Sequence, residues 1–293
     1  MLSEPDLRCQ GLAVGIDIGG TNTRIALFPS FASSEHTLLA TFPTSQSYEE
    51  QVQQIVTVLS QTSQFQIYSG IGLSLAGRIA PDGKSVIVAP NLPAYVGKPL
   101  VCDLFEQFKC SVRLAHDAVC GLLAEKKFGS LASIDRCAYL TVSTGTGAAI
   151  HLAKDDLSLT SSIEIGHQIL DGNTRVCLCG QTGCLETFTG GKQLELRYGV
   201  SPAQLTEPAF WDTFCEKLAL GIVNLAMLTR IEVVAISGAI ILNNPALLAL
   251  VQQKIDTLIR NASVALRLAV LGEQAPLVGA ALLLVTPESI ILH

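Results

Sequence analysis

The chain has little charge and few aromatic side chains, and it lacks long runs of any one residue class. Only 15% of its 293 residues are charged and 5% are aromatic, whereas 49% are apolar, which argues against disorder. A formal net charge of −6 and the lack of a Lys/Arg run argue against a nucleic-acid partner. The longest apolar runs, 233–242 and 275–285, are shorter than the roughly 18–20 residues of a membrane span, so no membrane partner is expected.

Several familiar motifs are also missing. Neither G-x-G-x-x-G nor G-x-x-x-x-G-K-[ST] occurs, and there is no G-x-S-x-G elbow or H-E-x-x-H pair. The first residues, MLSEPDLRCQ, carry acids and no apolar core, so they do not resemble a secretory signal. Nine cysteines, an odd number, suit a reducing compartment better than a disulfide framework. We therefore expect a soluble cytoplasmic protein, long enough for two domains.

What the chain does have is a dense group of metal ligands between positions 164 and 186, here called the Cys/His loop. One histidine is followed at +10, +12 and +17 by three cysteines: His167, Cys177, Cys179 and Cys184. Thiolate and imidazole are the ligands that tetrahedral zinc prefers, and a closed Cys₃His set is typical of a structural site. Gly172, Gly180 and Gly183 allow the loop to fold back on itself. The alternative is a loop of ordinary reduced thiols, but the other six cysteines are scattered singly, which favours zinc.

Two parts of the chain share a strand–turn–strand pattern. Residues 12–18 read as a buried strand, GGTNT as a turn and RIALF as a second strand, and CAYLTVS, TGTGAAI and AIHLA repeat this about 125 residues later. Two similar halves that mix strands with helices predict an α/β fold with two lobes and an interlobe cleft. The remaining predicted elements are helices at 48–61, 100–108, 118–128, 210–228, 245–261 and 279–284, and strands at 71–75, 111–114 and 233–237.

Each glycine turn offers groups suited to phosphate. Asp17 ends the first strand and precedes the first turn, Gly19–Asn22. Its carboxylate suits a hydrated Mg²⁺, while turn amides and the hydroxyl of Thr21 suit phosphate oxygens. The alternative is a plain hairpin turn. The second turn, Ser143–Gly147, lies at the matching place in the other half, so the two turns together could hold one polyphosphate.

Further polar residues are candidates for binding a hydroxylated substrate. Asp117 follows a strand and begins a helix, so it is either a structural N-cap or a carboxylate that accepts a proton from a substrate hydroxyl. Glu164 and Glu186 flank the Cys/His loop, where a metal would hold them for polyol recognition. Asn91 is either a turn former or a hydroxyl-binding group. The other histidines are expected on the surface: His36, His151 and His293.

In this order, the motifs resemble the ROK family of sugar kinases and sugar-responsive repressors. The resemblance extends over essentially the whole chain and rests on five segments: DIGGTNTR at 17–24, APNLPAYVGKPL at 89–100, HDAVCGLLAE at 116–125, TVSTGTG at 141–147 and EIGH…CLCGQTGCLE at 164–186. The resemblance implies the actin-like ATPase (ribonuclease H-like) fold. It divides the chain into a small lobe, 1–115 with 277–293, and a large lobe, 116–276.

The resemblance also implies a role for each motif residue. Asp17, Gly19, Gly20, Thr21 and Asn22 would form the first phosphate site, and Thr144, Gly145, Thr146 and Gly147 the second. Gly238 and Ala239 would lie under the adenosine. The hexose would be bound by Asn91, His116, Asp117, Glu164, His167 and Glu186, with Asp117 as general base. Zinc would be held by His167, Cys177, Cys179 and Cys184.

Three features of the chain depart from the family pattern. His116 stands where asparagine is usual, which affects the choice of sugar epimer or substituent. Ala148-Ala149 replaces glycines after the second turn, and Ala239 replaces a glycine in the adenosine turn, which would affect nucleotide affinity.

The predicted activity is ATP-dependent phosphorylation of a hexose at its 6-hydroxyl, with Mg²⁺ and a structural Zn²⁺, and glucose is the leading substrate. The alternatives are an N-acetylmannosamine or N-acetylglucosamine kinase and a catalytically silent sugar-binding paralogue. A sugar-sensing repressor would need a winged helix-turn-helix of roughly 70–80 residues before the first strand. Only about eleven residues precede it, so repression is not expected. The resemblance implies a homodimer.

Overall fold

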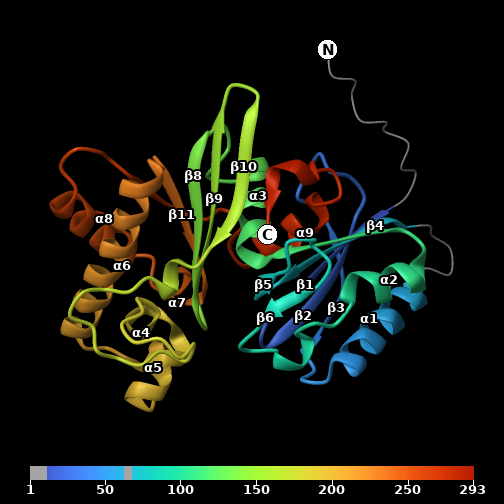
Figure 1. Ribbon diagram of the computed structural model, residues 1–293, viewed down its shortest axis with the longest axis horizontal. Helices are drawn as coiled ribbons and strands as arrows, with labels where there is room; N and C mark the ends of the chain where they lie inside the picture. Colours follow the sequence, from blue (N-terminus) through green and yellow to red (C-terminus); the bar gives the residue numbers. More distant parts are fainter. Residues whose placement is uncertain (1–11, 63–67) are drawn as a thin grey trace. The chain divides into compact units, whose positions relative to one another are not determined.

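The computed structural model describes residues 12–62 and 68–293, and these divide into two compact units. Unit 1 comprises the described residues up to Gly121, together with Pro276–Ser289 and His293. Unit 2 comprises Leu122–Ala275 and Ile290–Leu292. Each unit is built on one sheet with helices packed against it, as Figure 1 shows.

Unit 1 contains a five-stranded sheet in the order β3-β2-β1-β4-β7. Its strands are β1 Leu12–Ile18, β2 Asn22–Phe28, β3 Thr37–Pro43, β4 Tyr68–Leu75 and β7 Ser111–His116. Strands β1, β2 and β3 form an antiparallel meander, while β4 is parallel to β1 and β7 is parallel to β4. A short ribbon of β5 Arg78–Ile79 and β6 Val86–Val88 follows β4.

Side chains alternate between the two faces of this sheet, and that alternation decides where the polar site residues lie. Val14, Ile16 and Ile18 face a core shared with α1 (Tyr48–Thr62) and α2 (Leu100–Phe108). Gly15 and Asp17 therefore lie on the opposite face. There α9 (Ala275–Leu282) approaches so closely that a Cβ on Gly15 would lie 2.6 Å from the Leu277 carbonyl oxygen. Glycine is required here for space.

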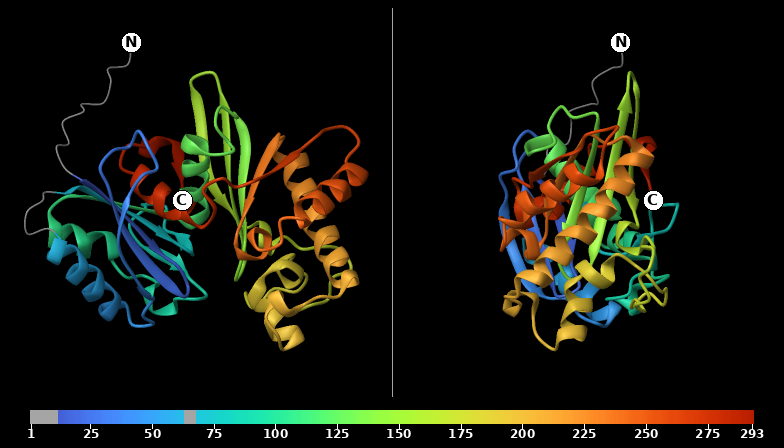
Figure 2. Two further views of the ribbon diagram at one scale, coloured as in Figure 1. Left: turned by 180° about the vertical axis from the view of Figure 1, so that it is seen from behind. Right: turned by 90° about the vertical axis from the view of Figure 1, so that its left-hand side faces the viewer.

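Unit 2 contains a six-stranded sheet in the order β12-β11-β8-β9-β10-β13. Its strands are β8 Arg136–Val142, β9 Thr146–Lys154, β10 Leu157–Ile163, β11 Val233–Ser237, β12 Ala265–Leu268 and β13 Ile291–Leu292. Strands β8, β9 and β10 form an antiparallel meander, which the left view of Figure 2 shows in green and yellow-green. Strand β11 is parallel to β8 and β12 is parallel to β11. The first five strands thus repeat the plan of unit 1, and the sequence predicts the strand–turn–strand that opens each repeat.

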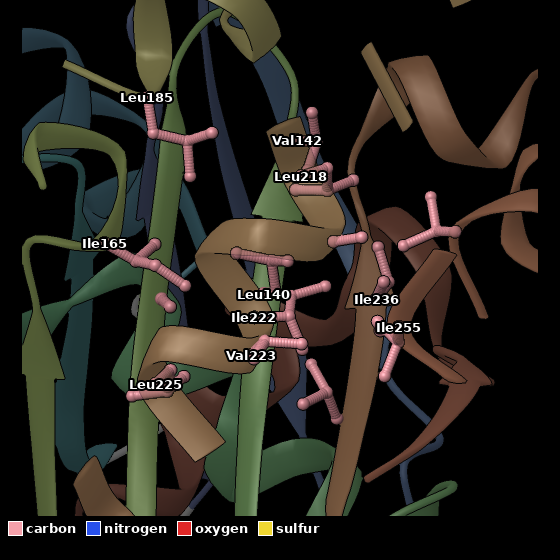
Figure 3. Packing of buried hydrophobic residues seen from close by; sticks show 14 of the residues in the cluster. Leu140, Val142, Ile165, Leu185, Leu218, Ile222, Val223, Leu225, Ile236 and Ile255 are labelled. Atoms are coloured by element: carbon pink, nitrogen blue, oxygen red, sulfur yellow. The ribbon is translucent and has the colours of Figure 1, made fainter. Parts of the chain in front are cut away.

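The core of unit 2 lies between this sheet and two helices, α6 (Pro208–Thr229) and α8 (Leu247–Leu258). Figure 3 shows Leu218 and Ile222 of α6 packed over Leu140 of β8 and Ile236 of β11. Shorter elements carry the rest of the unit: α4 Glu186–Thr189, α5 Gly191–Tyr198, α7 Ala239–Leu242 and the 3-10 turn η3 Ile165–His167. Helix α3, Asp117–Phe128, begins in unit 1 and ends in unit 2.

The predicted fold class is confirmed: this is the α/β fold of the actin-like ATPases. Each predicted helix is present, with ends shifted by no more than about one turn. The sequence does not predict strands β3, β5, β6, β10, β12 and β13 or helices α4, α5 and α7. No helix within the described ranges is long and apolar enough to cross a membrane.

One prediction about the histidines is wrong. His151 is only 7% exposed, because its strand, β9, lies inside the sheet between β8 and β10. Its ring nitrogen Nδ1 is 2.8 Å from the Thr160 hydroxyl. His36 and His293 are partly exposed, and the ring of His36 stacks on Phe28.

Candidate functional site

Asp17 lies at the carboxyl end of β1 and is almost fully buried. Arg24 Nη2 donates to its Oδ2 at 2.7 Å, and the Ser74 hydroxyl donates to its Oδ1 at 2.8 Å. Ser74 is the register partner of Asp17 on β4, so period-2 alternation places both on one face. Burial raises the pKa of Asp17, against the lowering effects of Arg24 and Ser74, and the negative charge of Asp117 raises it further. A bound cation would oppose this rise.

The first turn, Gly19–Asn22, follows Asp17 and is held from behind by a polar network. Thr44 Oγ1 donates to the Gly19 carbonyl at 2.8 Å, and Thr44 N donates to the Thr21 carbonyl at 2.9 Å. Gly20, Thr21 and Asn22 are exposed, so the side of the turn away from this network is open. The turn therefore presents a fixed backbone to solvent.

Asn91 lies against the first turn although about 70 residues separate them in sequence. A Cβ on Gly20 would lie 3.2 Å from the Asn91 Cβ. The loop that carries Asn91 contains a 3-10 turn, Pro93–Tyr95, whose Tyr95 ring is buried beside Tyr48. This packing fixes Asn91, which is itself exposed.

Asp117 is the first residue of α3, directly after β7. Ala118 N–H donates to its Oδ1 at 2.7 Å, and His116 Nδ1 lies 2.9 Å from the same oxygen. Among the described residues none hydrogen-bonds to its Oδ2, and 25% of the side chain is exposed. Burial raises the pKa of Asp117, but His116 and the Ala118 N–H together lower it below the ordinary value. The carboxylate is therefore ionised at neutral pH, with one oxygen open to accept a proton. The capping contact to Ala118 is compatible with this role.

In unit 2, the second turn is tied to Glu186. Thr146 N–H donates to Glu186 Oε2 at 2.8 Å, and the Thr146 hydroxyl is 2.8 Å from the Thr189 hydroxyl. Because Thr146 is buried, its hydroxyl is committed to the protein, whereas Thr144 is exposed. The start of α5 holds the other side of the turn, since Gly191 N–H donates to the Ser143 carbonyl at 2.8 Å.

Two glycines lie close to the groups around the second turn, and at Gly166 the backbone leaves no space for a side chain. A Cβ on Gly166 would lie 2.3 Å from the Thr146 carbonyl oxygen, and a Cβ on Gly145 would lie 2.8 Å from Glu186 Oε2. The turn, Glu186 and the first turn of η3 thus form one packed assembly. Two groups that the sequence analysis assigns to different ligands, phosphate and sugar, are in direct contact.

The residues expected under the adenosine also adjoin the second turn. Gly238 has φ +93°, and a Cβ there would lie 2.4 Å from the carbonyl oxygen of Val142, the residue before the turn. Ala239 begins α7. Ala148 and Ala149 are fully buried in β9, where they pair with β8 and β10. Ala148 belongs to the core of unit 2, and Ala149, the next residue of the strand, points to the opposite face of the sheet.

The Cys/His loop brings its four predicted ligands together. The ligand atoms of His167, Cys177, Cys179 and Cys184 all lie within 4.8 Å of one another. Cys179 Sγ is 3.7 Å from Cys184 Sγ, and Cys177 Sγ is 3.9 Å from His167 Nδ1. Sulfurs around a tetrahedral zinc with Zn–S bonds of about 2.3 Å lie about 3.8 Å apart, so the donor set and its spacing fit zinc.

The surroundings of the ligands suit a metal-bound thiolate. Gln193 Nε2 donates to Cys177 Sγ at 3.1 Å, and Gln181 Nε2 donates to Cys184 Sγ at 3.3 Å. Such donors stabilise negative sulfur. Burial raises the pKa of both thiols, and that of Cys177 reaches about 12, so a cation must take the place of the protons if they are to be thiolates at neutral pH. The three predicted loop glycines all have positive φ: Gly172, Gly180 and Gly183.

The loop is anchored in the core of unit 2 by its two ends. Ile165, beside Glu164, is 5% exposed, and Leu185, beside Glu186, is fully buried. Figure 3 shows both side chains directed into the cluster that α6 covers. Glu164 itself is exposed, and His167 is half-buried. The polar residues are therefore carried on segments whose neighbours cannot move without opening the core.

Sequence reasoning missed the residues that support the site. Arg24 lies within the motif DIGGTNTR, but the motif alone predicts no role for it, and Ser74, Thr44 and Gln51 belong to no recognised motif. Gln51 Nε2 donates to the buried hydroxyl of Thr23, which continues the network behind the first turn. The sequence offers only a weak signal for two of them: Thr44 is a polar residue directly after the strand β3, and Gln51 lies in the helix α1 on the side of its apolar residues.

Comparison with known proteins identifies the family. A sequence model described as "ROK family" matches residues 13–286, nearly the whole chain. This chain belongs to the ROK family. The ROK hexokinase of Thermus thermophilus has a similar structure, with a TM-score of 0.77 and 25% identity over 92% of this chain and 97% of that one.

Other members of the family are similar over shorter stretches. The Thermotoga maritima glucokinase is 27% identical over 175 residues, 59% of this chain and 55% of that enzyme. The N-acetyl-D-glucosamine kinase of Pectobacterium carotovorum is 27% identical over 63% of this ROK chain and 64% of the relative. The xylose repressor of Caldicellulosiruptor bescii is 32% identical over 127 residues, which is only 32% of the repressor. This chain thus matches about a third of the length of the repressors and somewhat more than half that of these kinases.

Proposed function

We propose that this ROK protein is an ATP-dependent hexose kinase that transfers the γ-phosphate to the 6-hydroxyl of the sugar. The observation that carries the proposal is the state of Asp117. Its carboxylate is ionised, one oxygen is held by Ala118 N–H and His116, and the other makes no hydrogen bond within the described part of the chain. Such a group can accept the proton of an attacking hydroxyl, a contribution typically worth about 10²–10⁴ in rate.

The remaining demands of phosphoryl transfer are positioning and stabilisation of charge. The exposed backbone of the first turn and the second turn, with Thr144, would bind the phosphates of ATP. Each oxygen of Asp17 already accepts one hydrogen bond, from Arg24 or from Ser74, and keeps a lone pair for a further one. Asp17 would therefore hold Mg²⁺ through a coordinated water that donates to this lone pair. Magnesium would supply positive charge to the phosphate oxygens. Gly238 and Ala239 would pack against the adenosine.

For the sugar, we propose that the hydroxyls of the hexose are bound by Asn91, His116, Asp117, Glu164, His167 and Glu186. A structural zinc on the Cys/His loop would hold His167 through one ring nitrogen and leave the other for the substrate. The zinc would act by bracing the loop and would take no part in the chemistry.

Glucose is the leading acceptor, as in the named glucokinase relative, and an N-acetylhexosamine is the alternative, as in the N-acetylglucosamine kinase relative. A sugar-binding paralogue without activity is the third reading, since other relatives are named repressors. The homodimer and the cytoplasmic location expected from the sequence remain part of the proposal, and size-exclusion chromatography with light scattering tests the dimer.

One screen separates these readings. ADP release is measured with ATP and Mg²⁺ over glucose, mannose, fructose, allose, N-acetylmannosamine and N-acetylglucosamine, with inorganic polyphosphate as a second donor. A hexose kinase gives sugar-dependent ADP release with glucose among the best acceptors. Preference for an N-acetyl sugar favours the alternative. Sugar binding without ADP release from any acceptor would overturn the kinase proposal.

A further inference from the structure

Unit 2 contains a cavity that the proposed kinase chemistry does not use. It has a volume of about 250 Å³ and lies among α4, α5, the start of α6 and the Cys/His loop. These helices contact one another and appear side by side in Figures 1 and 2. None of the residues assigned to sugar, nucleotide or metal lines the cavity. The cavity is therefore separate from the proposed site. Its wall includes Arg175, which lies in the Cys/His loop, and Phe188, which follows the end of that loop.

Two arginines line this cavity, and neither guanidinium is neutralised. Within the described ranges, Arg175 and Arg197 make no hydrogen bond or ion pair through their side chains. The only acid in the lining is Glu207, and it forms no salt bridge with either. Two like charges that line one small space favour an anion, because an anion would relieve their mutual repulsion and, for the partly buried Arg175, its lost hydration.

The geometry of Arg175 leaves its hydrogen-bond donors available. Its guanidinium carbon lies 3.7 Å from the centre of the Phe188 ring, so one face of the guanidinium is stacked. Guanidinium N–H groups point outward in the plane of the group, and stacking does not occupy them. The Phe188 ring thus holds the group flat with its edge free to bind an oxyanion in a bidentate manner.

Four aromatic rings contribute to the wall, together with Leu194, Glu207, Ala209 and Thr213. Phe210 meets Tyr198 edge-on, with ring centroids 5.3 Å apart, and Phe214 is fully buried behind it. Rings of this kind bind a flat apolar body. The volume is slightly below that of ordinary ligand pockets, which suits a ligand of about ten non-hydrogen atoms.

We propose that this cavity binds a small phosphate monoester with a flat apolar body, its phosphate held by Arg175 and Arg197 and its body by the aromatic wall. Because Arg175 is part of the Cys/His loop and Phe188 follows Glu186 by two residues, occupancy of the cavity would stiffen the loop that carries the proposed sugar ligands.

The protein carries its own reporter of occupancy. Trp211 is the single tryptophan of the chain, and its ring lies 4.8 Å from that of Phe210 and 5.3 Å from that of Phe214, both in the wall. Its emission, excited selectively, therefore responds to a ligand against these rings.

The test is a titration with phenyl phosphate, followed by calorimetry and by Trp211 fluorescence on the full chain loaded with zinc. The wild type is expected to show saturable binding with a fluorescence change, and Arg197→Gln is expected to weaken it at least tenfold. Arg260→Gln removes the same charge from an exposed position outside the cavity and is expected to bind like the wild type. Phenol, which lacks the phosphate, is expected to bind at least tenfold more weakly.

Three results would overturn the proposal: no saturable heat or fluorescence change, equal affinity in Arg197→Gln and wild type, or equal affinity for phenol. Binding at the phosphate turns alone would appear as the second result, since Arg197 lies outside them. Zinc content, measured on each variant, confirms that the loop is intact, and Arg197 is exposed, so its replacement is not expected to disturb folding.

Discussion

Acid should destabilise this protein through one buried histidine. His151 is 7% exposed and stays neutral in the folded state, where burial, together with the positive charge of Lys126, lowers its pKa to about 4. In the unfolded chain its pKa is about 6.5. Between these values the unfolded state binds more protons than the folded state, so the free energy of unfolding falls as the pH falls. The stabilisation is complete above pH 6.5 and is lost progressively toward pH 4.

The size of the effect follows from the two pKa values. At pH 7, protonation of His151 in the unfolded chain hardly changes the free energy of unfolding. At pH 5 it lowers that free energy by roughly 2 kcal/mol. His151→Gln cannot titrate and can still bond to the Thr160 hydroxyl. Between pH 7 and pH 5, the free energy of unfolding of the variant is expected to fall by roughly 2 kcal/mol less than that of the wild type. Other acids titrate in both proteins, so their contributions cancel in the comparison.

Urea unfolding at pH 7, 6 and 5, followed by circular dichroism, measures these free energies. Thr160→Val serves as the control, because it removes the partner of the imidazole but leaves the histidine, and it should retain the acid sensitivity of the wild type. Parallel pH dependences for wild type and His151→Gln would show that the imidazole is not held neutral, and the reasoning from burial would then be wrong.

Three further predictions concern the site. Glu186→Gln should raise KM for ATP about tenfold and should also raise KM for sugar, because it weakens a charge-assisted bond to the second turn worth about 1.5–3 kcal/mol. Glu164→Gln should raise KM for sugar alone. An equal rise in KM for ATP in both variants would contradict the role of the contact between Glu186 and Thr146. Cys179→Ser should lose zinc, read by metal analysis, and raise KM for sugar, and an unchanged KM without metal would refute the bracing role. His116→Asn should shift the acid limb of kcat/KM to higher pH, because it removes a group that lowers the pKa of Asp117; an unmoved limb would exclude that influence.

The strand–turn–strand that opens each unit could be predicted from the sequence, because the signals for it lie in neighbouring residues. Apolar alternation and glycine turns mark β1, β2, β8 and β9, and each is followed by helices of ordinary periodicity. Strands β3 and β12 were missed because both lie at an edge of a sheet and are largely exposed, so their sequences, TLLATFP and ALRL, lack a buried pattern.

For the candidate site, the sequence gives the motif residues but not what holds them. The four metal ligands were found because they lie within 18 residues and have unusual chemistry. The bond between Ser74 and Asp17 spans 57 residues, and that between Glu186 and Thr146 spans 40, so neither has a local signature. The neutral state of His151 depends likewise on its place inside a sheet that only the tertiary structure defines.

The replacement of Asp117 by asparagine tests the proposed mechanism most directly. Asparagine keeps the shape of the side chain and removes its ability to take a proton. With the best acceptor from the sugar screen, kcat is expected to fall by about 10²–10⁴ while the sugar Kd, measured by calorimetry, changes by less than about tenfold. Turnover at the wild-type rate in Asp117→Asn would contradict the assignment of Asp117 as the general base.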